Sequence, residues 1–254
     1  MSDANRKPTL VVGGGMTGIT TALELSEMGE DVILVEKEPF LGGRVASFTN
    51  YFPKLCPPWC GLEINFKRLK SDPHVTVHTQ AKVTKIEGDV GAYKATVEVA
   101  PRYINEKCTA CGDCAEACTV EIDDAYNKGM SKTKAVYMSH PMAYPKRYVL
   151  DKEAAGDADC KKIADACKYG AVNLDDAAQT LELEVGQVVW AAGWRNYDVS
   201  KVGYLNYDKL PDVLTNLEFE RLAATSGPTG GKLTRPSDGK EIESIAFVQC
   251  AGSR

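Results

Sequence analysis

Two short apolar runs near the N-terminus predict a pair of β-strands joined by a helix. Residues 10–12 and 31–35 are rich in valine, leucine and isoleucine, which is typical of buried parallel strands. The segment between them repeats small or apolar side chains at helical spacing: Ile19, Ala22, Leu23 and Ser26. Gly29 follows at a place where glycine commonly ends a helix. The pattern therefore predicts a β–α–β unit in the first part of the chain.

Further strands are predicted downstream, where apolar and polar positions alternate. The alternating stretches are residues 75–78, 82–87, 93–99 and 180–185. The first three of these stretches, within residues 73–100, fit a β-meander added to a doubly wound sheet. A more continuous apolar run at 186–194 predicts a core strand ending in a turn, and residues 245–250 predict another strand. A short helix is expected at 217–222.

Residues 119–156 break this pattern. They are polar, contain Asp123 and Asp124, and include two prolines at 141 and 145. We expect a surface loop here, in a position to contact a partner.

Composition and charge narrow the class of protein. The chain has 254 residues, of which 44% are hydrophobic and 26% charged, as in ordinary globular proteins. Its net charge of −5 argues against a nucleic-acid-binding role. No apolar run approaches the roughly 18 residues that span a bilayer, and residues 1–8 lack the apolar core of a signal peptide. We expect a cytoplasmic protein that meets a membrane only through partners.

A glycine-rich turn after the first apolar run carries the first candidate chemistry. Gly13, Gly15 and Gly18 form the G-x-G-x-x-G pattern, and Glu36 closes the second strand 18 residues after Gly18. Glycines at these places permit a tight turn, close approach of a pyrophosphate and close packing of the following helix. Glu36 is expected to accept hydrogen bonds from a ribose hydroxyl. The sequence therefore predicts a dinucleotide-binding site.

Two further segments indicate which dinucleotide binds. Gly42, Gly43 and Arg44 resemble the second glycine pair of two-dinucleotide-binding flavoproteins, where it turns the chain beneath FAD. Residues 190–194 resemble the A-T-G strand of the same proteins, with Ala192 in place of threonine. The resemblance implies FAD and an α/β, Rossmann-like FAD-binding domain. The remaining positions expected to contact the cofactor are Met16, Thr17, Lys37 and Gly193.

Nine cysteines are many for a reducing compartment, where clusters of cysteine more often bind metal or perform redox chemistry. Cys56 and Cys60 form a C-x3-C pair on a proline turn, loosely like the redox disulfide of flavoprotein disulfide reductases. Three interpretations stay open for them: a redox dithiol, cluster ligands or two buried thiols.

The most specific signal is a compact cysteine motif. Cys108, Cys111, Cys114 and Cys118 have C-x2-C-x2-C-x3-C spacing, which wraps a loop around a 4Fe–4S cluster. Zinc sites more often draw on two separated pairs, so the spacing favours iron–sulfur over zinc. The local set of four is one assignment of the ligands.

A second assignment follows from a partial copy of the motif around Cys167, which resembles the second half of a two-cluster ferredoxin. In those proteins the fourth cysteine of each motif binds the other cluster. The resemblance implies that Cys167, rather than Cys118, completes one cluster. In the same register Asp157 and Ile163 stand where cysteines would hold a second cluster, which we expect to be absent. Cys118 and Cys160 would then be neighbours, as thiols or as a pair.

Taken together, these motifs and the closing residues 247–254 resemble the heterodisulfide reductase A-subunit family over essentially the whole chain. Within it, the likeness is greatest to the A-subunit of the quinone-interacting membrane-bound oxidoreductase complex. The resemblance implies FAD, one 4Fe–4S cluster and electron transfer between the menaquinone pool and adenylylsulfate reductase. The implied partners are adenylylsulfate reductase, a flavin and iron–sulfur subunit, and a quinone-interacting membrane subunit.

The predicted organisation is an FAD-binding βαβ unit with a β-meander at 1–100 and an inserted ferredoxin-like iron–sulfur segment at 101–178. Residues 179–254 are expected to return to the flavoprotein domain and to leave it incomplete. Two other functions stay open. One is a flavoprotein disulfide reductase that uses Cys56 and Cys60, and the other is a structural subunit whose cysteines hold zinc.

Overall fold

A computed structural model describes residues 6–140 and 142–252. Pro141, in the predicted surface loop at 119–156, lies outside this description. So do residues 253–254, in the closing segment 247–254. Contacts divide the chain into two compact units, each assembled from separate stretches of sequence. The first unit comprises residues 1–46, 59–122 and 133–193, and the second comprises 47–58, 123–132 and 194–254.

A parallel four-stranded sheet forms the centre of the first unit. Its strands are β1 (Thr9–Val12), β2 (Val32–Val35), β3 (Val75–His78) and β11 (Gln187–Trp190). They lie in the order β11-β1-β2-β3, and every neighbouring pair is parallel. Leu10 pairs with Ile33 on one side and Val188 on the other, so the first strand is flanked on both edges. The predicted strands at 10–12, 31–35 and 186–194 are confirmed.

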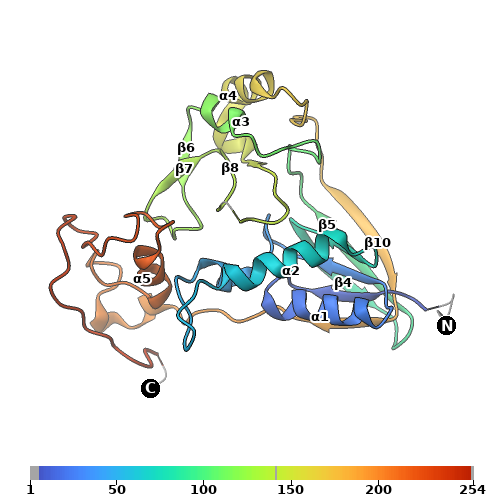
Figure 1. The fold of residues 1–254 in the computed structure, drawn as a ribbon, viewed down its shortest axis with the longest axis horizontal. Helices are drawn as coiled ribbons and strands as arrows, with labels where there is room; N and C mark the ends of the chain where they lie inside the picture. The colour runs from blue at the N-terminus through green and yellow to red at the C-terminus, as the bar shows by residue number, and fades with distance from the viewer. Residues whose placement is uncertain (1–5, 141, 253–254) are drawn as a thin grey trace. The chain divides into compact units, whose positions relative to one another are not determined.

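Two helices, α1 (Met16–Glu27) and α2 (Trp59–Ser71), cover one face of this sheet. Figure 1 shows them on the same side. The predicted inward face of α1 is confirmed, because Ile19, Ala22, Leu23 and Ser26 are all buried. Gly29 adopts a φ of +84° directly after the helical C-cap, as expected for a glycine stop. The second helix was not predicted, although its buried Leu62, Phe66 and Leu69 have the i, i+4, i+7 spacing of one helical face.

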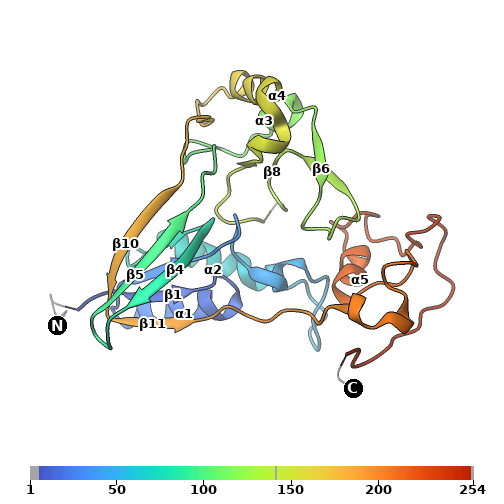
Figure 2. The ribbon, with the colours of Figure 1, turned by 180° about the vertical axis from the view of Figure 1, so that it is seen from behind.

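An antiparallel sheet covers the opposite face of the parallel sheet, as Figure 2 shows from behind. It consists of β4 (Ala81–Glu87), β5 (Tyr93–Val99) and β10 (Gln179–Val185), in the order β10-β5-β4. Leu10 and Val35 point into this second interface, whereas Val11 and Leu34 point toward the helices. Neighbouring residues of a strand face opposite sides, so one short strand serves both cores. The predicted meander is thus a separate sheet, and residues 75–78 join the parallel sheet instead.

A smaller core lies beyond β5, in the segment that contains the cysteine motif. Its elements are α3 (Asp113–Ala117), β6 (Glu121–Asp123), β7 (Lys132–Lys134), β8 (Val136–Tyr137), β9 (Val149–Leu150) and α4 (Lys152–Ala166). Strand β6 pairs with β7, and β8 pairs with β9. Asp151 caps α4 by accepting a hydrogen bond of 3.0 Å from the backbone of Ala154.

The expectation that residues 119–156 form only a surface loop is wrong. Ala135 and Val136 are fully buried, and Leu150 and Ala155 are nearly so. All four pack in one hydrophobic cluster with the side chains of α4. The polar composition of the segment concealed these few apolar positions, because a two-residue strand leaves almost no periodic signal.

The second unit contains little regular structure. It includes the short 3-10 helices η2 (Val199–Lys201) and η3 (Gly203–Leu205) and the helix α5 (Asn216–Ala223), while η1 (Gly43–Ser47) lies at its boundary. Helix α5 confirms the predicted helix at 217–222. Thr215 and Glu218 cap it reciprocally. The strand predicted at 245–250 is wrong, since no strand is present there. In the described part of the chain, no helix is long and apolar enough to cross a membrane.

The buried guanidinium of Arg221 joins the three stretches of the second unit. The side chain is 1% exposed and donates hydrogen bonds to Asn127 Oδ1, Ser47 O and Ser226 Oγ at 3.0, 3.0 and 3.1 Å. Its Cζ atom also lies 4.1 Å from the ring centroid of Tyr126. A single side chain therefore holds acceptors from each of the three stretches.

Replacing Arg221 with methionine is expected to destabilise the second unit by about 2–4 kcal/mol, because buried acceptors lose their donor. Denaturant unfolding of the purified protein measures the change. Arg235→Met is a matched control, since Arg235 is largely exposed and pairs with Asp238 at the surface. The control should change the free energy of unfolding by less than about 1 kcal/mol. Equal effects of the two substitutions would contradict a joining role for Arg221.

Candidate functional site

The glycine-rich turn connects β1 directly to α1. The backbone N–H of Gly13 donates to Val35 O at 2.8 Å, which fixes the turn to the end of β2. The first hydrogen bond of the helix runs from Ile19 N to Gly15 O at 2.9 Å. The N–H groups of the first helical turn therefore point out of the N-terminus, where a helix dipole favours an anion.

Three of the glycines in the turn have different packing requirements. A β carbon at Gly18 would lie 1.8 Å from Gly13 O, and one at Gly13 would lie 2.3 Å from Ala191 O. Both glycines are therefore required by the protein's own packing. A β carbon at Gly15 would meet nothing closer than Gly43 Cα at 4.0 Å, and Gly15 has an ordinary φ of −77°. The protein's own packing therefore does not require glycine at that position, and the close approach of a ligand there stays a prediction.

The second glycine pair lies against the first. Gly42 N donates to Gly14 O at 2.8 Å, and Gly42 forms an isolated parallel bridge with Gly15. A β carbon at Gly43, which has a φ of +58°, would lie 3.0 Å from Gly15 Cα. The two glycine segments that the sequence separates by about 25 residues thus form one backbone surface beside the N-terminus of α1.

Glu36 lies at the end of β2 as predicted, but its carboxylate already has partners. It is 6% exposed and accepts hydrogen bonds from Gly14 N at 2.6 Å and Glu38 N at 2.9 Å. It therefore stabilises the glycine turn. A carboxylate has capacity for further donors, so the role expected toward a ribose stays a prediction.

The other expected cofactor contacts occupy different surroundings. Lys37 is exposed and pairs with Glu38 at 3.4 Å. Arg44 is partly buried, and its Nη1 atom would lie 3.5 Å from a β carbon at Gly193. Gly193 itself has a φ of +67° at the turn that follows β11. Met16, Thr17 and Ala192 are at least partly exposed beside the same turns.

Cys56 and Cys60 are both free thiols, half-buried and exposed respectively. Cys56 pairs with Tyr51 in an isolated antiparallel bridge of the second unit. Cys60 lies in the first turn of α2 and belongs to the first unit. A redox function for this pair stays a prediction.

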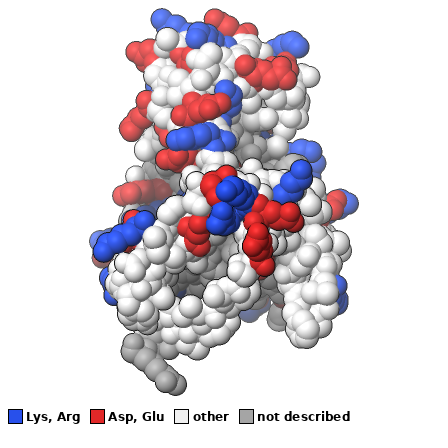
Figure 3. Space-filling model, turned by 90° about the vertical axis from the view of Figure 1, so that its left-hand side faces the viewer, with Lys and Arg blue, Asp and Glu red and all other residues white. Residues whose placement is uncertain are grey.

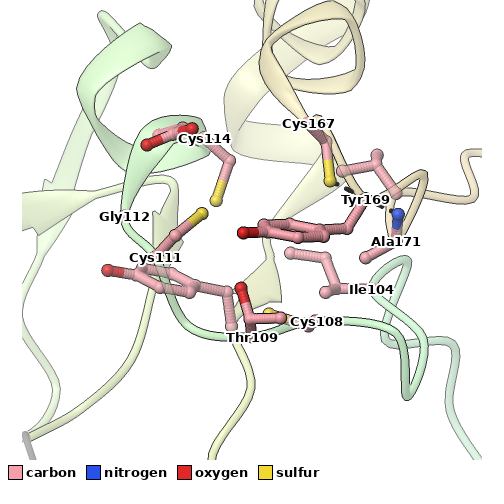
Figure 4. Close-up of a pocket in the computed structure, with 12 residues that line it drawn as sticks. Ile104, Cys108, Thr109, Cys111, Gly112, Cys114, Cys167, Tyr169 and Ala171 are labelled. Atoms are coloured by element: carbon pink, nitrogen blue, oxygen red, sulfur yellow. Dashed lines mark hydrogen bonds between the residues drawn. The ribbon is translucent and has the colours of Figure 1, made fainter.

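The structure gathers four cysteines around one pocket. Cys108, Cys111 and Cys114 come from the loop before α3 and from α3 itself, and Cys167 is the C-cap of α4. Figure 4 shows the sulfur atoms of Cys111 and Cys114 side by side across from Cys167. The pocket is completed by Ile104, Thr109, Gly112, Asp113, Tyr148, Tyr169, Ala171 and Val172.

The local backbone is shaped around these thiols. Ala110 and Gly112 both have left-handed backbones, with φ of +57° and +98°, which winds the loop tightly between consecutive cysteines. Ala110 N donates to Cys108 Sγ at 3.4 Å, and Ala171 N donates to Cys167 Sγ at 3.3 Å, the bond dashed in Figure 4. Such N–H to sulfur hydrogen bonds stabilise negative charge on a ligating thiolate.

The thiols of the pocket influence one another strongly. Burial, together with Cys108, Cys111 and Cys167, raises the pKa of Cys114 to about 12. The Cys114 thiolate is therefore disfavoured unless positive charge enters the pocket. Metal binding would supply that charge and release the protons.

Cys118 and Cys160 lie outside this pocket. They are 2% and 1% exposed and pack with Ile163 in the hydrophobic cluster around α4. Cys118 Sγ donates to Val120 O at 3.4 Å, and Cys160 Sγ lies 3.9 Å from Lys152 O. Burial raises the pKa of Cys160, with a further contribution from nearby Cys118. The two cysteines are close, as expected, and both are free thiols.

A buried carboxylate fixes the chain that follows Cys118. Asp159 is 4% exposed and accepts hydrogen bonds from Thr119 N at 2.6 Å, Val120 N at 3.1 Å and Lys162 Nζ at 2.9 Å. These donors, Lys162 first, hold the pKa of Asp159 well below its usual range. Thr119 stands where ferredoxins usually have proline, and its backbone N–H makes this contact available.

The donors of the pocket are cysteine sulfur atoms, which bind both iron–sulfur clusters and structural zinc. Among the described histidine, cysteine, aspartate and glutamate side chains, no group of three is arranged to hold a metal ion. The pocket nevertheless offers four sulfur donors and two N–H groups directed at sulfur. Asp113 is the one carboxylate among the described lining residues, and it is paired with Lys168 at 3.0 Å. This donor set fits a thiolate-bound cluster.

Sequence reasoning missed the aromatic lining. Tyr169 lies two residues after Cys167 and could have been noticed from the motif. Tyr148 could not, because it reaches the pocket from the segment that was expected to be a surface loop. Arg102, which hydrogen-bonds the backbone of Tyr148, also gave no signal in sequence.

The charge distribution agrees with the composition. On the face shown in Figure 3, lysine and arginine side chains lie among aspartates and glutamates, without a broad basic patch.

Comparisons with known proteins are consistent with this site. The family model described as an NAD(P)-binding Rossmann-like domain matches residues 11–70, which contain both glycine segments. The A-subunit of the H(2):CoB-CoM heterodisulfide,ferredoxin reductase of Methanothermobacter thermautotrophicus is 37% identical over 246 residues, or 96% of this chain and 37% of that protein. An iron-sulfur A-subunit of the CoB–CoM heterodisulfide reductase of Methanopyrus kandleri is 39% identical with the same coverage, 96% and 37%.

The chain therefore spans little more than a third of the length of these curated relatives. Among solved structures, a FAD-dependent pyridine nucleotide-disulphide oxidoreductase from Desulfovibrio vulgaris is 25% identical. That alignment covers 38% of this chain and 22% of the other, with a TM-score of 0.27.

Proposed function

Because this chain belongs to the heterodisulfide reductase A-subunit family over 96% of its length, we propose that it binds FAD and one 4Fe–4S cluster in an electron-transfer subunit of a multi-subunit oxidoreductase. The observation that carries the proposal is the meeting of Cys108, Cys111, Cys114 and Cys167 around one pocket. This pocket lies in the same compact unit as the glycine turn.

The glycine turn supports the nucleotide half of the proposal. The N-terminus of α1 would bind the pyrophosphate through the N–H groups of its first turn, and Gly15 leaves room for that approach. The adjoining pair Gly42 and Gly43 would carry the chain past the remainder of the FAD. Arg44, beside Gly193, would contribute positive charge near the same surface.

The thiol pocket supports the other half. The four cysteines would hold the cluster, while Ile104 and Tyr148 would limit the access of water to it. When bound, FAD exchanges electrons in pairs and the cluster exchanges them singly, so the chain would convert one mode into the other. In this proposal no side chain acts as acid, base or nucleophile. The protein's task is to bind, orient and exclude water.

We propose one cluster rather than two because two of the four ligand positions of the second motif carry Asp157 and Ile163 instead of cysteine. The burial of Ile163 beside Cys118 and Cys160 in one hydrophobic cluster supports this proposal.

We further propose that this protein is the A-subunit of a quinone-interacting membrane-bound oxidoreductase. Its partners would be a flavin and iron–sulfur subunit together with a quinone-interacting membrane subunit, through which it would associate with the membrane. The complex would connect the menaquinone pool with adenylylsulfate reductase. The sequence resemblance and the half-lost second cluster motif support this assignment within the family.

A reductive titration under anaerobic conditions tests the proposed function. The purified protein should take up about three electrons per chain, two for FAD and one for the cluster. Uptake of about two electrons would contradict the cluster, and uptake of about one would contradict the FAD. A zinc-binding structural subunit would take up none.

A further inference from the structure

Arg102 is a buried arginine that joins the glycine segments to the thiol pocket. It follows β5, is 6% exposed, and its guanidinium donates to Tyr148 O at 3.1 Å, Arg147 O at 3.0 Å and Pro39 O at 2.8 Å. Weaker hydrogen bonds reach Thr79 Oγ1 at 3.3 Å and Gln80 Oε1 at 3.4 Å. The side chain therefore contacts both regions of the first unit.

Every one of these acceptors is a neutral oxygen. Within residues 6–140 and 142–252, no carboxylate forms an ion pair with the guanidinium of Arg102. Burial first, and then the nearby charge of Arg147, lower the pKa of Arg102 to about 9. The carboxylate of Asp176 accepts from the backbone N–H groups of Arg102 and Tyr103, at 2.9 and 3.1 Å, and not from the guanidinium. A buried cation without an ion-pair partner is costly, so a further negative charge nearby would stabilise it.

The thiol pocket is adjacent to this cation. The backbone oxygen of Tyr148 accepts a hydrogen bond from Arg102, and the side chain of Tyr148 lines the pocket. Ile104, two residues after Arg102, also lines the pocket. A thiolate at Cys108 is close enough to act electrostatically on Arg102. Four thiolates in the pocket would provide the missing negative charge.

The other side of Arg102 rests on the loop that leads to the second glycine pair. The Cζ atom lies 4.9 Å from the ring centroid of Phe40, beside the bond to Pro39. The next residue, Leu41, donates from its backbone to Tyr144 O at 2.7 Å, and the ring of Tyr144 stacks on Phe66 at 5.3 Å. These contacts fix the position of the cation relative to both candidate cofactor regions.

We propose that Arg102 is the positioning residue that supplies the counter-charge of the thiol pocket, and that its positive charge favours the reduced state of the cluster held there. The inference rests on the proposed function. Reduction adds one electron to the cluster and breaks no bond, so the pocket gains one negative charge. A fixed cation nearby lowers the free energy of that state relative to the oxidised one.

The test is a redox titration of the cofactor-loaded protein with Arg102→Gln. Removing the charge should lower the ratio of reduced to oxidised cluster at a fixed potential by at least about tenfold, equivalent to a midpoint about 59 mV lower for one electron. Iron and FAD content per chain should stay as in the wild type. Lys146→Met is the matched control, because Lys146 is exposed in the same segment, and its midpoint should not change.

Arg102→Lys separates charge from geometry and also serves where the glutamine variant yields too little folded protein. Lysine keeps the charge and loses most of the hydrogen bonds. Its reduced-to-oxidised ratio should stay within about threefold of the wild type while the thermal unfolding temperature falls. A tenfold shift in the lysine variant, or none in a folded glutamine variant, would overturn the proposal. A wild-type protein without iron would overturn the proposed function as well.

Discussion

Replacing Cys167 with serine is expected to reduce iron and labile sulfide to less than about a tenth of the wild-type content. Cys167 supplies one of the four sulfur atoms around the pocket, although it lies 49 positions after Cys118, the last cysteine of the compact motif. Losing one thiolate of a four-thiolate site removes both a ligand and a negative charge. The measurement is chemical analysis of iron and sulfide in anaerobically purified protein.

Cys118→Ala is the matched variant. The spacing of the motif includes Cys118, but in the structure its side chain packs in the hydrophobic core and not at the pocket. It should retain its iron and sulfide, with a modest loss of stability from the truncated side chain. The opposite result, in which Cys118→Ala loses iron and Cys167→Ser keeps it, would show that the cluster is bound by the local set of four cysteines.

A second pair of substitutions distinguishes binding from folding in the glycine turn. Gly15→Ala is expected to weaken FAD binding by at least about tenfold, or about 1.4 kcal/mol, because the new methyl group occupies the space left for the pyrophosphate. Its stability should change by less than about 1 kcal/mol, since the backbone at Gly15 suits any residue and the nearest atom is 4.0 Å away. Fluorescence titration of the FAD-free protein measures the affinity.

Gly18→Ala should have the reverse effect. Its β carbon would lie 1.8 Å from Gly13 O, so the helix must move away from the turn at an expected cost of about 3 kcal/mol or more. Denaturant unfolding without FAD measures this cost. If Gly15→Ala bound FAD normally and lost stability instead, the open space at Gly15 would have to serve packing rather than a ligand.

In the first unit, the elements that could be predicted are those determined by short stretches of sequence. The strands β1 and β2 and the buried face of α1 were predicted because their periodicity is complete within about 30 residues. The glycine turn was predictable for the same reason. The two glycine segments are joined by a backbone bridge between Gly15 and Gly42. This contact could not be predicted from the sequence, because it joins residues that are distant along the chain.

The errors fall where neighbours in space decide the structure. Residues 245–250 have the composition of a strand, but a strand needs a partner edge, and the structure gives them none. Ala135 and Val136 lie in a polar segment and are nevertheless core residues, because α4 and the cysteine loop enclose them. Neither outcome can be read from a local pattern.

Some residues of the candidate site were also predictable from local sequence, and others were not. The spacing of Cys108, Cys111 and Cys114 is local and indicated cluster chemistry at once. The place of Cys167 required a comparison of two motifs, and it stays a prediction until the ligands are tested. Arg102 had no sequence signal, since its importance arises from the burial of its guanidinium among neutral acceptors, with no carboxylate paired to that group among the described residues.

Cofactor analysis of the anaerobically purified protein determines whether the chain holds both FAD and an iron–sulfur cluster. We expect about four iron atoms, four labile sulfides and one FAD per chain. About one zinc with no iron or sulfide would contradict the cluster, and protein without flavin would contradict the role of the glycine turn.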